Sequence, residues 1–495
     1  MTLAGPGLSP AAVIPGAATG AVHLAGTGRR ESSRGRWLAR HPAWPVVALL
    51  AGYPLWWALG VADFAWIGFA MPMAGRLLAW RLHRSRPVRL PPGMGLWTVF
   101  LLFTVAGIVM LTLTAPGTLP SPLSHRIVSW VVRTSSYLAL TVLLLYAGNL
   151  TEAELPRRRL AGLVGLLAVY ATVLGVAAMV LPGFGFTSPA ELLLPHEIRS
   201  NTFIQASMHP ALAQIQDVFG TPGGQSRPKA PFDYTNIWGE CLSLSLPWLL
   251  VAVRGEGGSG GGGRGRRGRL VSGAVLAAAL VVLVYSLNRG VWLGVLVAVA
   301  YLAVRLAARG RLALLGGLAA GLAALTVLVL VSPLHGVISQ RLANGKSNTI
   351  RMTLSTQAVA DALTSPVLGY GDTRQRQGSA NSISIGPTPD CPQCGQQQVG
   401  STGQLWLLLI TTGIAGALLY IAFFARLAWE FRRDPTPYGL AGGMVLLLSF
   451  CYLPAYDALP AALGITILSV ALLWRSDQHR RSLLSSTGPS GPGRE

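Results

Sequence analysis

The sequence predicts an all-α, polytopic integral membrane protein of about twelve transmembrane helices with two long outer loops. Of its 495 residues, 51% are hydrophobic and only 12% are charged, which is too apolar for a soluble chain of this length. The apolar residues form runs, most of them close to the ~20 residues that a spanning helix needs. We place these runs at about residues 44–61, 63–80, 95–115, 127–148, 160–181, 236–253, 270–287, 290–308, 312–332, 403–425, 438–454 and 459–474.

Both ends of the chain are expected to be disordered cytoplasmic tails. Residues 1–42 are rich in Gly, Ala, Pro and Ser and contain a cluster of arginines just before the first apolar run. A cleaved signal peptide is disfavoured, because the segment before these arginines is too weakly apolar and does not begin with basic residues. Residues 477–495 follow the last run. Residues 43–476 are therefore predicted to form one transmembrane domain.

The basic residues are distributed by side of the membrane. With the N-terminus inside, and with each charged residue near the end of a run counted on the nearer side, the inner side holds 28 Arg against 8 acidic residues; the outer side, apart from Arg133 within the fourth run, holds 8 Arg and 2 Lys against 10 acidic residues. An excess of basic residues in cytoplasmic loops is the general rule. The net charge of +21 thus indicates a multi-pass protein of a cell membrane with both termini in the cytoplasm. It does not indicate a protein that binds nucleic acid.

Both long connections, at about residues 182–235 and 333–402, fall on the outer side. Most connections in compact proteins are short, so two long loops on one side indicate a functional face. Within the second loop, residues 347–363 are predicted to form a helix. Arg351, Leu354, Ala358 and Ala362 recur there at three- and four-residue spacing, and Pro366 ends the segment.

Arginines close to the hydrocarbon layer are the first candidate functional residues. Arg289 belongs to an Asn-Arg-Gly turn between two apolar runs, where a charge is costly unless it meets water, a counter-ion or an anionic ligand. The alternative is an interfacial anchor or a loop salt bridge. Arg133 lies inside the fourth run near its outer end, so it either faces a wet cavity or extends outward to water.

Three stretches resemble the O-antigen ligase-like and polysaccharide-polymerase membrane protein family. The run Tyr285–Gly294 resembles the family's Ser/Asn-Arg-Gly signature. The stretch Arg227–Gly239 is similar to its Arg…Phe-x-x-x-Asn-x-x-Gly start of a span. Arg351, followed by the turn 366–371 and then Gly413-Ile-Ala-Gly416, is similar to its large-loop segment. The resemblance covers about residues 160 to 425.

This resemblance implies a bacterial glycosyltransferase of cell-surface polysaccharide biosynthesis. Such a protein takes a glycan from an undecaprenyl-pyrophosphate carrier at the outer face of the membrane and joins it to a hydroxyl acceptor on a glycan or a lipid, as a ligase or a polymerase. Members are described as needing no metal, and no cofactor is expected. Fixed guanidinium groups must then stabilise the leaving pyrophosphate. Arg289, Arg227, Arg351 and Arg133 are the predicted substrate-binding residues.

The sequence departs from the family pattern at the end of the second outer loop. Many relatives carry a His-Asn pair about eleven residues before the Gly-x-x-Gly, and Thr402 stands at that spacing here. A threonine hydroxyl is not a base near neutral pH, so either another group takes this role or the activity has changed. The possible substitutes are His335, His209, Asp361 and Asp372, although for each of them a solvated loop residue is the favoured reading.

Cys391-Pro-Gln-Cys394 is the other distinctive motif of this loop. Such a pair can be half of a zinc site, a redox motif or a local disulfide. No second cysteine pair and no nearby histidine completes a metal site, and the loop is predicted to face an oxidising compartment. We therefore favour a disulfide between Cys391 and Cys394, and we expect no metal.

Two other readings of the sequence stay open. A transporter or flippase for a lipid-linked sugar or another solute also fits twelve spans, although the two halves show no convincing repeat and the few charges inside the spans leave little for ion coupling. A catalytically inactive family member is the third reading, because the histidine is missing.

Overall fold

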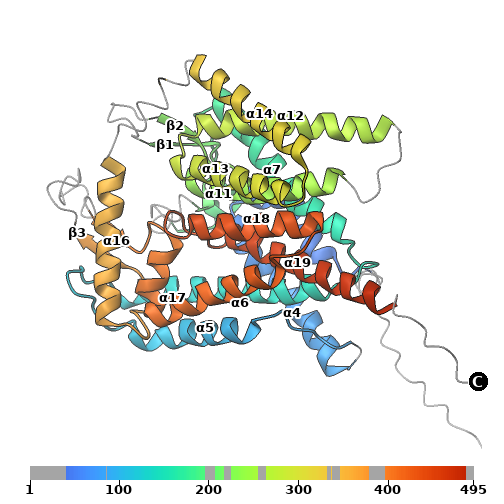
Figure 1. Ribbon diagram of the computed structural model, residues 1–495. Coiled ribbons are helices and arrows are strands. Elements are labelled where there is room, and N and C mark those ends of the chain that lie inside the picture. The colour runs from blue at the N-terminus through green and yellow to red at the C-terminus, as the bar shows by residue number, and fades with distance from the viewer. Residues whose placement is uncertain are drawn as a thin grey trace, which may run out of the picture. The chain divides into compact units, whose positions relative to one another are not determined.

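The computed structural model describes residues 41–84, 86–195, 207–216, 225–254, 263–331, 336, 346–377 and 396–486 (Figure 1). These residues are mostly helical, as predicted. The longer helices are α4 (Ala62–Leu82), α5 (Met94–Ala106), α6 (Leu123–Asn149), α7 (Arg157–Val180), α11 (Thr235–Arg254), α12 (Gly263–Tyr285), α13 (Arg289–Ala307), α14 (Leu312–Val331), α16 (Lys346–Thr364), α17 (Gln404–Phe431), α18 (Pro437–Tyr452) and α19 (Ala461–Ser486). The short elements are α2 (Trp44–Ala51), α3 (Tyr53–Ala58), the 3-10 helix η1 (Gly107–Met110), α8 (Pro189–Leu192) and the strands β1 (Ala213–Gln216), β2 (Gln225–Pro228), β3 (Arg374–Gln377) and β4 (Gln396–Val399).

Every apolar run of the sequence coincides with a helix or with two consecutive helices. Within the described part of the chain, five helices are long and apolar enough to cross a membrane: Leu123–Asn149, Arg157–Val180, Thr235–Val253, Arg289–Ala307 and Gln404–Phe431. Shorter apolar helices occupy four of the other runs: Met94–Met110, Gly273–Tyr285, Leu312–Ala324 and Pro437–Tyr452. A membrane protein with several spanning helices is thus supported, and the total of twelve stays a prediction.

The structure adds detail that the apolar pattern does not contain. The first run is interrupted at Gly52, where α2 ends and α3 begins with Pro54 in its first turn. Each long loop contains a short antiparallel hairpin, β1 with β2 and β3 with β4, and neither hairpin was predicted. The helix predicted for residues 347–363 is confirmed as α16.

The boundaries predicted for the two tails fit only in part. Residues 1–40 and 487–495 lie outside the described residues. The C-terminal tail was predicted to begin at residue 477, but α19 continues to Ser486. Ion pairs from Asp477 to Arg480 and Arg481, one helical turn away, stabilise this extension.

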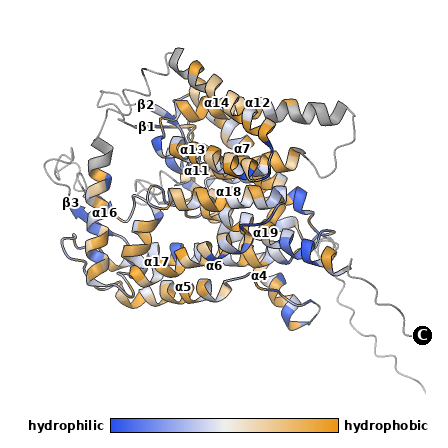
Figure 2. Cartoon of the chain, in the orientation of Figure 1, coloured by the Kyte–Doolittle hydropathy of each residue, from blue (hydrophilic) through white to orange (hydrophobic). Residues whose placement is uncertain are grey.

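The core is built around α19. Residues 461–477 of this helix are all buried, and it packs against α6, α7, α11, α17 and α18. Close approach depends on small residues, since a Cβ at Gly148 would lie within 2.4 Å of the Trp474 ring and one at Gly442 within 2.7 Å of Leu473. Figure 2 shows hydrophobic residues along most helices, and hydrophilic residues toward the C-terminal end of α19.

A kink in α17 joins two of the motifs that carry the family resemblance. Gly413 has φ +70°, which interrupts the helix, so the carbonyls of Ile410 and Thr411 accept hydrogen bonds from the backbone N–H groups of Tyr370 and Gly371 at 2.7 and 3.1 Å. In return, Ala415 N–H donates to the carbonyl of Pro366 at 3.1 Å. The turn 366–371 is therefore fixed on α17, and α16 packs against α17 (Figure 1).

Candidate functional site

The Asn-Arg-Gly turn packs against the connection between α18 and α19, residues 453–460. Asn288 precedes α13, and its side chain accepts a hydrogen bond from the Tyr456 hydroxyl and donates one to the carbonyl of Thr235 at 3.5 Å. Gly290 faces the Tyr456 ring, because a Cβ at this position would lie 2.7 Å from Tyr456 Cζ. A Cβ at Gly294 would lie 2.5 Å from Tyr452 Cζ. The small residues of the motif thus allow the turn to contact two tyrosines.

Three of the predicted substrate-binding arginines meet at this turn. Arg227, in β2, donates from Nε to the carbonyl of Ser286 at 2.6 Å and is 4% exposed. Arg351, in α16, donates from Nη1 to the carbonyl of Ala455 at 2.7 Å. Burial lowers the pKa of Arg351, and the positive charge of Arg289 lowers it further. Residues from three distant segments therefore form one cationic cluster, which we call the arginine cluster: Arg227, Arg289 and Arg351.

The connection 453–460 holds this cluster to the start of α17. Gln404 donates its backbone N–H to the carbonyl of Tyr456 at 2.7 Å, and its buried side chain donates to the Tyr137 hydroxyl at 2.8 Å. Thr402, which stands where the family that the sequence resembles often has histidine, precedes Gly403, and a Cβ at Gly403 would lie 2.6 Å from the Pro454 backbone. The Thr402 hydroxyl is buried without a hydrogen-bond partner among the described residues. Thr402 therefore adjoins the loop that Arg351 contacts.

Two predicted candidates pair with each other. Arg133 donates from Nη2 to Asp372 Oδ1 at 2.9 Å, and both side chains are largely buried, with 12% and 6% exposed. Arg133 also donates to the carbonyl of Gly371 at 3.4 Å. This ion pair joins α6 to the turn that follows α16, so Asp372 already has a cationic partner.

Carboxyl groups that are not among the predicted site residues lie near one another. Asp63, at the start of α4, and Asp233, which precedes α11, are close enough to interact electrostatically. Asp457, in the connection 453–460, accepts the backbone N–H of Leu459 at 3.2 Å, and burial raises its pKa. Asp457 also acts electrostatically on Asp63, which places the three carboxyls in one neighbourhood.

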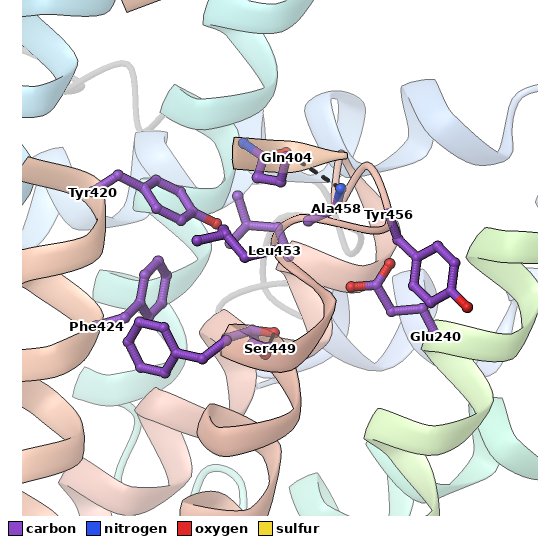
Figure 3. A pocket seen from close by; sticks show the side chains of 11 residues that line it. Glu240, Gln404, Tyr420, Phe424, Ser449, Leu453, Tyr456 and Ala458 are labelled. Atoms are coloured by element: carbon purple, nitrogen blue, oxygen red, sulfur yellow. Dashed lines mark hydrogen bonds between the residues drawn. The ribbon is translucent and has the colours of Figure 1, made fainter. Parts of the chain in front are cut away.

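Glu240 projects from α11 into a small cavity beneath this connection. Figure 3 shows its carboxyl group beside Tyr456 and directed toward Ala458 and Gln404. The residue is 2% exposed, and its Oε2 atom has no hydrogen-bond partner among the residues that the structure describes. The cavity measures about 20 Å³, which is room for about one water molecule.

The other candidate bases have partners of their own or lie outside the described residues. His209 pairs through Nδ1 with Glu191 at 3.0 Å, and Glu191 is itself part of the capping box of α8. Asp361 accepts a hydrogen bond from Gln357 at 2.7 Å, and burial raises its pKa. His335, Cys391 and Cys394 lie outside the described residues.

One signal in the sequence pointed to the missed carboxyls. Asp63, Glu240 and Asp457 each lie in or directly beside an apolar run, the same placement that singled out Arg289. Applying that criterion to acidic as well as basic residues selects all three. Asp233 lacks this signal, because only its contact with Asp63 distinguishes it from other loop residues.

Among the described residues, no group of three or more His, Cys, Asp and Glu side chains is arranged to hold a metal ion. Comparison of the chain with protein-family models, with curated proteins and with solved structures found no match.

Proposed function

We propose that this chain is a membrane glycan transferase that moves a glycan from an undecaprenyl-pyrophosphate carrier to a hydroxyl acceptor. The observation that carries the proposal is the arginine cluster: Arg227 contacts the Asn-Arg-Gly turn, Arg351 contacts the connection 453–460 that packs on this turn, and Arg289 lies near enough to act on the pKa of Arg351. Guanidinium groups match phosphate oxygens in geometry and charge. Several guanidinium groups near one turn would give the pyrophosphate of the carrier both hydrogen-bond donors and fixed positive charge.

The reaction requires stabilisation of negative charge on the leaving pyrophosphate and removal of a proton from the acceptor hydroxyl. The acceptor oxygen forms a bond to the anomeric carbon while the bond from that carbon to the pyrophosphate oxygen breaks, and the electron pair leaves with the carrier. Fixed positive charge stabilises the leaving pyrophosphate more than the intact donor. We assign this role to Arg227, Arg289 and Arg351.

The proton of the acceptor hydroxyl needs a base, and we assign this role to Asp63 or Asp233, two carboxyls that interact with each other electrostatically. His209 and Asp372 are less suited, because each has an ionic partner of its own. In this account Arg133 is a positioning residue that fixes Asp372 and the turn 366–371 on α6.

The same proposal includes the side of the membrane on which the arginine cluster lies. We place the arginine cluster at the outer face of a cell membrane, with both termini in the cytoplasm, because the predicted inner loops carry the excess of arginine. The remaining apolar helices then complete about twelve spans.

The test uses purified protein in proteoliposomes with a lipid-linked oligosaccharide extracted from its own host. Transfer predicts that undecaprenyl pyrophosphate is released and that Arg289→Ala reduces release by at least about a hundredfold, the scale seen when one transition-state donor is removed. Arg158→Ala is the matched control. This arginine lies in the first turn of α7, is exposed and donates to the carbonyl of Ala252 in α11. No release by a folded wild-type protein that binds the carrier would contradict the proposal.

A transporter of a lipid-linked sugar is the second candidate, and Glu240 favours it. An acidic side chain inside a spanning helix is typical of ion-coupled transport. The same proteoliposomes separate the two functions: a transporter moves the intact lipid-linked sugar across the bilayer and releases no undecaprenyl pyrophosphate. An inactive family member would do neither.

A further inference from the structure

The stretch of chain that follows α7 exposes its large apolar side chains and buries its charged one. This stretch, residues 181–195, includes α8, and we call it the post-α7 segment. Leu193, Leu192 and Phe184 are 86%, 61% and 48% exposed. Glu191, the one charged residue of the segment, is 5% exposed. A loop that faces water shows the reverse pattern, and an exposed apolar patch marks a contact with a lipid or a partner.

The polar side chains of the segment are bound to the protein. Ser188 is fully buried, and its Oγ atom accepts the backbone N–H of Glu191 at 3.1 Å. The Glu191 carboxylate in turn pairs with His209 Nδ1 at 3.0 Å. The backbone N–H of Ala190 donates to the carbonyl of Leu59, at the end of α3, at 3.2 Å. These contacts fix the polar side of the segment inward, so that the leucines point away from the protein.

The backbone of the segment also suits an environment without water. In hydrocarbon an N–H group finds no water, so it needs an acceptor within the protein. Pro182, Pro189 and Pro195 have no N–H to satisfy. The apolar residues between them donate at 3.0 to 3.2 Å to the carbonyls of Leu181 (from Phe184), Pro210 (from Phe186), Ser188 (from Leu192), Ala190 (from Leu193) and Glu191 (from Leu194).

The exposed surface of α7 indicates what covers this segment. Within α7, Val173, Val176 and Val180 are exposed at three- and four-residue spacing, which places them on one face. This helix is long and apolar enough to cross a membrane, so its exposed apolar face is expected to contact lipid. Leu181 and Phe184 continue the exposed apolar surface directly past the end of the helix. Lipid that covers α7 therefore reaches the start of the post-α7 segment.

We propose that the post-α7 segment lies in the interfacial layer of the bilayer, with Phe184, Leu192 and Leu193 in contact with lipid hydrocarbon. Apolar elements of this kind lie about 5 to 10 Å into the boundary between headgroups and acyl chains. The predicted outer loop, about residues 182–235, then begins inside the membrane interface and not in water. The pair of Glu191 with His209 holds a later part of this loop to the lipid-bound segment. The proposal requires that α7 spans the membrane, and it is independent of the transferase activity.

The test places a fluorescent amino acid in place of Leu193 of the full-length protein by codon suppression. The protein is reconstituted in phosphatidylcholine vesicles, and two quenchers are compared: bromine on the lipid acyl chains, which acts within the bilayer, and iodide on both sides of the vesicles, which acts from water. We expect brominated lipid to lower the fluorescence by at least about half and iodide to have little effect, with bromine near the headgroups more effective than bromine near the chain ends.

Two control positions give the limits of the measurement. Gln398 is exposed in β4, in the second predicted outer loop, and a probe there should be quenched by iodide and not by brominated lipid. Val173 lies on the exposed face of α7, roughly 10 Å along the helix from Val180, so a probe there should respond most to bromine near the chain ends.

A charged substitution tests the cause. Leu192→Glu puts a charge where we place hydrocarbon, so it should lower quenching by brominated lipid at position 193 by at least about twofold. Gln398→Glu adds the same charge to the other loop and should leave this quenching unchanged.

Two outcomes would overturn the proposal. Quenching at position 193 by iodide and not by brominated lipid would mean that the segment faces water. Protection from both quenchers would mean that a protein surface, such as a second copy of the chain, covers it. Should the variant at 193 fail to fold, a probe in place of Phe184, where an aromatic ring already stands, carries the same test.

Discussion

Replacing Gly290 by Ala should separate the Asn-Arg-Gly turn from Tyr456. The added Cβ would overlap the Tyr456 hydroxyl and lie 2.7 Å from Cζ, closer than real Cβ contacts, so the ring or the start of α13 must move. Overpacking of this kind costs about 1 to 3 kcal/mol, whereas Gly to Ala inside a helix gains up to about 1 kcal/mol. We therefore expect a net loss of roughly 1 to 2 kcal/mol in unfolding free energy.

Function should suffer more than stability, because Tyr456 and Asn288 hold the turn that carries Arg289. A 1 Å displacement at such a position can cost about a hundredfold in rate. The assays are thermal unfolding in detergent and donor turnover in proteoliposomes. Gly316→Ala, in α14, is the matched control, since a Cβ there meets nothing within 4 Å; it should leave both unchanged or raise stability slightly.

A double variant tests the cause directly. In a Tyr456→Ala background the contacted ring is absent, so adding Gly290→Ala should cost nothing further or should stabilise the helix. The coupling free energy between the two positions would then be about 1 to 2 kcal/mol. Equal destabilisation by Gly290→Ala with and without the Tyr456 ring would refute the packing described here.

Three further predictions concern the surroundings of the site. Gly413→Ala should destabilise by at least about 1 to 2 kcal/mol, because φ +70° disfavours a side chain and the Cβ would lie 2.7 Å from the carbonyl oxygen of Pro366; unchanged unfolding in detergent would contradict the described kink. Arg133→Ala should cost about 3 to 5 kcal/mol as a broken buried pair, and the reversed pair Arg133→Asp with Asp372→Arg should recover part of it; no recovery in a double-mutant cycle would argue against the salt bridge. Burial raises the pKa of Asp361, so its contribution to stability falls as pH rises from the unfolded value of about 4 through the folded pKa. In a series of unfolding temperatures measured at different pH values, Asp361→Asn should lack this loss of stability with rising pH. Parallel curves for the wild type and Asp361→Asn would exclude a raised pKa of Asp361.

The helices could be predicted from the sequence because apolar runs of spanning length have few alternatives in a membrane. Each run coincides with a helix, and the amphipathic spacing around Arg351 and Ala358 gave α16 correctly. The hairpins were missed, because strands such as Gln225–Pro228 are too short and polar to show an alternating pattern. The extension of α19 was missed for a similar reason, since ion pairs rather than apolar residues stabilise it.

The site was predicted residue by residue, but its assembly was not. Arg289 stood out by its placement beside an apolar run and Arg351 by the resemblance of its segment to a family motif, yet their approach to each other depends on the connection 453–460. The pairing of Arg133 with Asp372 joins residues on different elements and leaves no trace in local spacing. The proximity of Asp63 to Asp233 likewise becomes visible only in three dimensions.

The most direct test of the proposed function is single-turnover release of undecaprenyl pyrophosphate from a radiolabelled lipid-linked oligosaccharide. Wild-type protein would be compared with Arg227→Gln, Arg289→Gln and Arg351→Gln, each shown to be folded by its unfolding temperature. The account predicts release by the wild type and a loss of at least about a hundredfold in each variant. Release that persists in all three variants would contradict a catalytic role for the arginine cluster.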